Sequence, residues 1–99
     1  MKVVWTQEAL DRLSDIEDFI SQGSPKNAIR FVNYLIQRGE GLSEFPRLGR
    51  VVPEISNPDI REILAKEYRI VYKLQKKTIE ILTVFKGRKI LDLAKLDVE

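Results

Sequence analysis

The chain contains no cysteine and no histidine. Without cysteine it can form no disulfide and has no thiolate to act as a nucleophile or a metal ligand. Without histidine it has neither an imidazole general base nor a histidine-type metal site. The carboxylates are scattered along the chain. We therefore expect no metal ion and no cofactor.

Long apolar runs are also missing, since no stretch approaches the ~18 apolar residues of a membrane span. The N-terminus turns polar directly after Trp5, too soon for a signal peptide. We therefore expect a cytoplasmic protein without membrane contact. With 43% hydrophobic residues, disorder is not expected, and residues 1–99 are predicted to form a single domain around one modest core.

Positive charge is concentrated in the second half of the chain. Residues 60–89 carry nine basic and three acidic side chains, although the net charge of the whole chain is only +2. This asymmetry indicates a surface for a polyanion or for an acidic partner segment. The alternative is that lysines flank short strands to protect their edges and keep them soluble.

Two amphipathic helices are predicted in the first half of the chain. Thr6 is a suitable N-cap for a helix over Gln7–Gln22. Ser24-Pro25 begins a second helix, which we extend to about Ser43 because the apolar period continues. Gly39 falls on the apolar stripe, where a small residue allows close packing. A break of the helix at Gly39 is the alternative.

Period-two alternation and β-branched residues predict the strands. We expect a short first strand at Lys2–Trp5 and three later strands at Arg61–Lys66, Tyr68–Gln75 and Thr78–Phe85. The order β-α-α-β-β-β predicts an α+β fold, in which a helical hairpin packs on one face of a twisted, mainly antiparallel four-stranded sheet. The tail Lys89–Asp97 is either a short helix or a loose end. The opposite face of the sheet, or its rim, would remain for binding.

Several segments together resemble the RelE/ParE superfamily of toxins from type II toxin–antitoxin modules. The resemblance covers nearly the whole chain, and the order and spacing of the segments are more specific than any one of them. The matching segments are Trp5–Ile16, Ser24–Ala28, Phe45–Arg50 with Pro53-Glu54, Arg61-Glu62, Tyr68–Tyr72 and Ile81–Lys89. The Phe-Pro-x-x-Gly-Arg and Tyr-Arg-Ile-Val-Tyr motifs look most like the ParE, or plasmid stabilisation, branch.

This resemblance implies a twisted antiparallel sheet beside a helical hairpin, and a labile antitoxin whose disordered segment folds over the toxin in a hetero-oligomer. We expect the antitoxin to contact both the hairpin and the exposed sheet. The implied target is DNA gyrase for ParE-like members, or mRNA in the ribosome for RelE-like members.

Cleavage of RNA would need a proton acceptor, a proton donor and cations for the phosphate charge. If the chain is such a nuclease, its candidate catalytic residues are Glu54, Arg61, Tyr68, Lys86 and Arg88. The candidate basic surface for target binding consists of Arg50, Arg61, Arg69, Lys86, Arg88 and Lys89. Lys86 stands where many RNA-cleaving relatives have histidine, and an ordinary lysine is a poor proton shuttle at neutral pH.

We therefore favour a ParE-like gyrase inhibitor that acts by protein contact and is not an enzyme. The first alternative is a ribosome-dependent mRNA endonuclease whose basic sheet grips phosphates. The second is an inactive relative that serves only as a protein-binding module.

Overall fold

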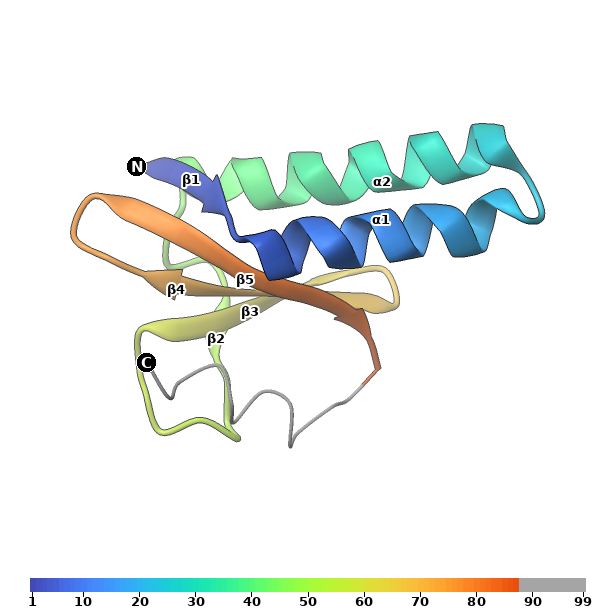
Figure 1. Cartoon of the computed structure of the whole chain (residues 1–99). Coiled ribbons are helices and arrows are strands. Elements are labelled where there is room, and N and C mark those ends of the chain that lie inside the picture. Colours follow the sequence, from blue (N-terminus) through green and yellow to red (C-terminus); the bar gives the residue numbers. More distant parts are fainter. Residues whose placement is uncertain (88–99) are drawn as a thin grey trace.

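The computed structural model describes residues 1–87, which form two layers, a helical hairpin and a sheet (Figure 1). The elements in chain order are β1 (Lys2–Trp5), α1 (Gln7–Ser21), α2 (Pro25–Glu40), the 3₁₀ turn Gly41–Ser43, β2 (Arg50–Val51), β3 (Ile60–Ala65), β4 (Tyr68–Leu74) and β5 (Thr78–Lys86). The predicted α+β class is confirmed. The predicted tail Lys89–Asp97 lies outside the described residues.

The helix boundaries follow the predicted capping residues. The Thr6 hydroxyl accepts a hydrogen bond from the backbone N–H of Ala9 at 3.1 Å, and the Ser24 hydroxyl accepts one from Asn27 at 3.3 Å. Both side chains thereby satisfy N–H groups that the first helical turn leaves free. The second helix is α-helical to Glu40 and then tightens into the 3₁₀ turn, so the predicted end at Ser43 is reached by a different kind of helix.

The sheet has five strands in the order β1-β5-β4-β3-β2. β1 runs parallel to β5, and the other pairs are antiparallel. The predicted count of four strands is therefore wrong, because β2 adds a fifth. This strand is only two residues long, and it pairs Arg50 with Glu62 and Val51 with Arg61. A pairing that short leaves no alternation for a sequence pattern to reveal.

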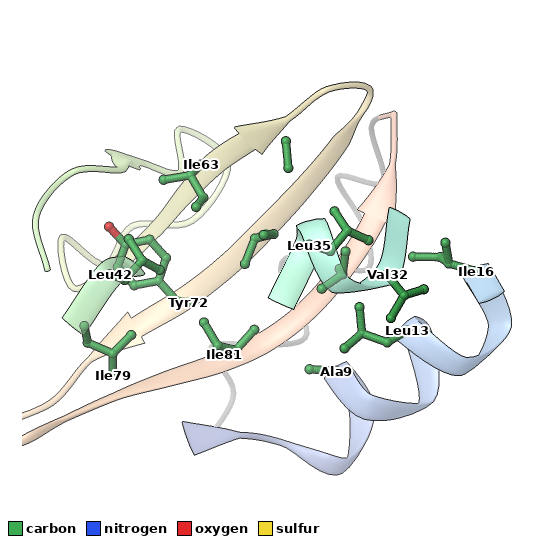
Figure 2. Close-up of a cluster of buried hydrophobic side chains, with 13 residues drawn as sticks. Ala9, Leu13, Ile16, Val32, Leu35, Leu42, Ile63, Tyr72, Ile79 and Ile81 are labelled. Carbon is green, nitrogen blue, oxygen red and sulfur yellow. The ribbon is translucent and has the colours of Figure 1, made fainter. Parts of the chain in front are cut away.

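The apolar residues that recur at helical spacing in α1 and α2 are buried in the core between the helices and the sheet. Figure 2 shows α1 and α2 side chains facing those of β3, β4 and β5. This buried cluster consists of Ala9, Leu13, Ile16, Val32, Leu35, Leu42, Ile63, Ala65, Ile70, Tyr72, Ile79, Ile81 and Val84. The helical hairpin therefore packs on one face of the sheet, as predicted.

The other face of the sheet has a smaller apolar cluster. Its members come from the strands and from the loop after β2: Val52, Ile55, Ile60, Val71, Leu82 and Phe85. The face that sequence reasoning left open for binding is thus partly occupied by the chain's own loop. The members of this cluster are themselves buried.

Candidate functional site

A buried carboxylate holds two of the predicted cationic residues on the face opposite the helices. The Glu62 side chain, in β3, is only 1% exposed. Arg69 Nη1 lies 2.9 Å from both of its carboxylate oxygens, and Arg50 Nε and Nη2 each lie 2.6 Å from Oε2. Strand register brings these groups together, since Arg50 is directly opposite Glu62 and Arg69 is on the neighbouring strand β4.

The two arginines that contact Glu62 differ in their exposure to solvent. The Arg69 side chain is only 13% exposed, so it has little contact with water, and its guanidinium is hydrogen-bonded to Glu62. The Arg50 side chain is 59% exposed and still presents much of its guanidinium to solvent. A buried charge is tolerated when it is paired and hydrogen-bonded. Arg69 therefore compensates the Glu62 charge, and Arg50 contributes the excess positive charge of the site.

Arg61 lies on the other face and holds a loop. It is directly opposite Tyr72, whose side chain belongs to the core under the helices, and opposite residues share a face. Arg61 Nη1 donates to the carbonyl oxygen of Gly49 at 2.9 Å. The Tyr72 hydroxyl donates to the Pro46 carbonyl and accepts from the Gly49 N–H, both at 2.9 Å. Three hydrogen bonds therefore fix the chain between α2 and β2.

The close approach of this loop to the sheet requires a glycine. A Cβ at Gly49 would lie 2.6 Å from the Glu62 carbonyl oxygen and 2.7 Å from the Tyr72 hydroxyl. Burial raises the pKa of the Tyr72 phenol, while the bond from Gly49 and the charges of Arg61 and Arg47 lower it by less. Tyr72 is therefore protonated at neutral pH, and its hydroxyl positions the loop.

Tyr68 and Lys86 form a separate group at the other end of β4. They are directly opposite each other, and the Tyr68 ring lies 5.3 Å from the Phe31 ring on α2. Lys66 Nζ lies 5.1 Å from the centre of the Tyr34 ring, close enough for a cation–π contact. Lys86 is exposed and lies 3.9 Å from a Glu67 carboxylate oxygen. Tyr68 therefore packs in an aromatic cluster, and the exposed Lys86, which is paired with Glu67, lies beside it.

The structure divides the predicted site residues among several places. Arg50 and Arg69 share Glu62, Arg61 faces the opposite side, and Lys86 lies beside Tyr68. Glu54 follows β2, and its Oε1 is buried with no hydrogen-bond partner among residues 1–87. Arg88 and Lys89 lie outside the described residues. The expected single basic surface is therefore not formed by Arg61, Arg69 and Lys86.

Sequence reasoning missed Glu62 and Tyr72 as organising residues. One signal for Glu62 was present, because strand alternation puts it on the same face as Ile60, and a carboxylate on an apolar face needs a cationic partner. The role of Tyr72 had no such signal, since its hydroxyl meets a loop 26 residues earlier in the chain.

The sheet separates the candidate groups for proton transfer and charge stabilisation. General acid–base catalysis needs a donor and an acceptor converging on one substrate position. In residues 1–87 the tyrosine–lysine pair and the arginine–glutamate cluster lie on opposite faces of the sheet.

Within the same range, no group of three or more acidic residues could hold a metal ion. None of the helices described is long and apolar enough to cross a membrane.

Comparison with known proteins identifies the family. The model of the ParE toxin of the type II toxin–antitoxin system parDE matches residues 3–91. Toxin RelE2 of Caulobacter vibrioides is 32% identical over 84 residues, which cover 84% of this chain and 91% of that protein.

Solved structures have the same fold. A chain of the chromosomal ParDE system from P. aeruginosa superimposes with a TM-score of 0.75 at 21% identity, covering 89% of this chain and 97% of that one. A chain of the toxin–antitoxin complex RelBE2 from Mycobacterium tuberculosis gives a TM-score of 0.65 at 21% identity, covering 89% and 92%. The chain therefore belongs to the ParE toxin family of type II toxin–antitoxin systems, within the RelE/ParE superfamily.

Proposed function

We propose that this protein is the toxin of a type II toxin–antitoxin module and that it inhibits DNA gyrase by protein contact. A cognate antitoxin would neutralise it. Family membership supports the toxin assignment, and similar solved structures come from the ParDE and RelBE2 systems. The choice of gyrase rests on the arrangement of the site residues.

The observation that supports this choice is that two of the cationic side chains are bound to other groups of the protein. Arg69 is bound to Glu62, and Arg61 is bound to the Gly49 carbonyl. Stabilising phosphate charge in a transition state needs cations that are preorganised around the reacting group. Here the arginines instead hold a strand and a loop in place, and the chain has no histidine for proton transfer.

The mRNA endonuclease alternative has one observation in its favour. Lys86 is exposed, and it lies directly opposite Tyr68 on the neighbouring strand. A phenol and an amine so placed could contact one phosphate. The pair lies on the opposite face from the exposed Arg50, however, so the three groups do not share a surface.

The test is a pair of reactions with the purified chain. In one, the chain is incubated with gyrase and supercoiled plasmid; in the other, with translating ribosomes. We expect linear plasmid from stabilised gyrase cleavage complexes, intact mRNA, and reversal on addition of the antitoxin. Codon-specific mRNA cuts with unaffected plasmid would support the endonuclease, and no effect in either reaction would support an inactive binding module.

A further inference from the structure

The loop between α2 and β2 exposes two large apolar side chains. Phe45 is 64% exposed and Leu48 is 59% exposed, although they are only three residues apart. A turn brings them together, since the Leu48 N–H donates to the Phe45 carbonyl at 3.0 Å. Two adjacent exposed apolar side chains on one turn form a compact patch, which is more informative than scattered exposed residues. We call Phe45, Leu48 and the residues between them the apolar loop.

The apolar loop is held rigidly on its sheet side. The Tyr72 hydroxyl bonds to Pro46 and Gly49, and Arg61 bonds to the Gly49 carbonyl. The side chains that point outward are therefore carried by a fixed backbone. A surface fixed in this way loses little conformational entropy when a partner binds.

Hollows flank the apolar loop on two sides. A hollow of about 700 Å³ is lined by Met1, Leu74, Gln75 and Lys76 together with residues 44–48. A smaller one of about 330 Å³ is lined by Tyr34, Gln37, Arg38 and Gly41 together with Glu44, Phe45 and Leu48. The loop thus stands as a ridge between two depressions, and apolar side chains of a partner could fill both.

The charge around the ridge is mainly positive. Arg47 and Lys76 line the larger hollow, Arg38 lines the smaller one, and Glu44 is the one acidic residue lining either of them. Arg47 and Lys76 form no ion pair within residues 1–87, and Arg38 donates to the Leu64 carbonyl. These cations would attract carboxylates placed beside apolar groups.

We propose that the apolar loop is a docking site for an acidic, amphipathic segment of a partner protein. Its apolar side chains would straddle Phe45 and Leu48, and its carboxylates would meet Arg38, Arg47 and Lys76. A second copy of this chain fits less well, because the same three cations would face each other. A nucleic acid fits less well because the centre of the patch is apolar. The proposal does not depend on gyrase being the target.

A designed peptide tests the proposal directly. The probe is a fluorescently labelled peptide in which pairs of leucines alternate with pairs of glutamates, and the control peptide has lysines in place of the glutamates. We expect the acidic peptide to bind the wild-type chain, with affinity that falls as salt is added, and the lysine peptide not to bind. Fluorescence anisotropy measures both.

Matched variants localise the binding. Phe45→Ser with Leu48→Ser should weaken binding about tenfold or more. Phe19→Ser, which changes an equally exposed phenylalanine on α1, should leave the affinity unchanged. The proposal is overturned if the acidic peptide fails to bind the wild type, if the lysine peptide binds equally well, or if the double variant keeps full affinity. Concentration-dependent self-association that the double variant abolishes would instead identify a second copy as the occupant.

Discussion

Glu62 lies between two arginines on the face of the sheet that the helices leave uncovered. The composition of residues 60–89 predicts their net charge, but it does not show which cations are paired with carboxylates. The partners of Glu62 are 12 and 7 residues away in sequence, and the strand register joins them. The separation of Arg61 from Arg69 follows from register in the same way. Charge composition therefore predicted a basic segment, and register decided which of its cations are available.

Loss of the Glu62 charge should destabilise the fold. In Glu62→Gln the nearly buried Arg69 guanidinium loses its counter-ion, and we expect a loss of about 3 kcal/mol in the free energy of unfolding. The control is Glu67→Gln, which removes an exposed carboxylate 3.9 Å from Lys86 and should change stability by less than about 0.5 kcal/mol. Urea unfolding of both variants measures the difference. Equal effects would show that the buried cluster is not stabilised by this charge.

The Tyr72 hydroxyl should stabilise the fold in a pH-dependent way. Tyr72→Phe leaves the Gly49 N–H and the Pro46 carbonyl without their partner, at a cost of about 2 kcal/mol at pH 8. Burial raises the folded-state pKa of Tyr72 above the ordinary 10.0, so this contribution is complete below pH 10 and is lost as pH rises through the folded-state pKa. The stability gap between wild type and variant should therefore narrow in alkaline urea titrations. A gap independent of pH would contradict this account.

At the scale of elements, the contact between β1 and α2 explains why the second helix contains a glycine. Gly39 faces Trp5, and a Cβ there would lie 2.6 Å from Trp5 Cζ2 and 2.7 Å from Cη2. The Trp5 indole N–H also donates to a Glu40 carboxylate oxygen at 2.7 Å. The prediction that Gly39 allows close packing is confirmed, and the α-helix continues through it.

A pair of alanine substitutions tests this contact. Gly39→Ala gains about 1 kcal/mol of helix propensity but must displace the indole, so we expect a net loss of about 1–2 kcal/mol. Gly41→Ala meets no atom within 4 Å and should be neutral or slightly stabilising. Thermal unfolding of the two variants compares them. A stabilised Gly39→Ala would mean that the indole moves aside at little cost.

The strands also show where sequence patterns stop being informative. β3, β4 and β5 were predicted within a residue or two of their ends because each is at least six residues long, which is long enough for a strand pattern to be recognised. The two-residue β2 was missed because it is too short to show a pattern, and the hydrogen bonds that hold the loop before it come from the distant residues Arg61 and Tyr72. The parallel pairing of β1 with β5 depends on the path that the chain takes through α1 and α2 before it reaches the sheet again. The hydrophobic periodicity of the sequence does not determine this path.

At the scale of the whole molecule, the two faces of the sheet have different roles. One face is covered by the helical hairpin (Figure 1), and the other carries the second apolar cluster with the Glu62 site. The apolar loop exposes Phe45 and Leu48, and the cations Arg50 and Lys86 are also exposed. The proposed inhibition by protein contact would use these exposed surfaces.

Gyrase-dependent plasmid linearisation tests the proposed mechanism most directly. The wild-type chain is compared with the double variant Tyr68→Phe, Lys86→Ala, which removes the phenol and amine that a nuclease would use. We predict that both chains produce similar amounts of linear plasmid with gyrase and leave ribosome-bound mRNA intact. An endonuclease would instead cut the mRNA, lose about 10²–10⁴-fold activity in the double variant, and leave the plasmid supercoiled. That result would contradict inhibition by contact.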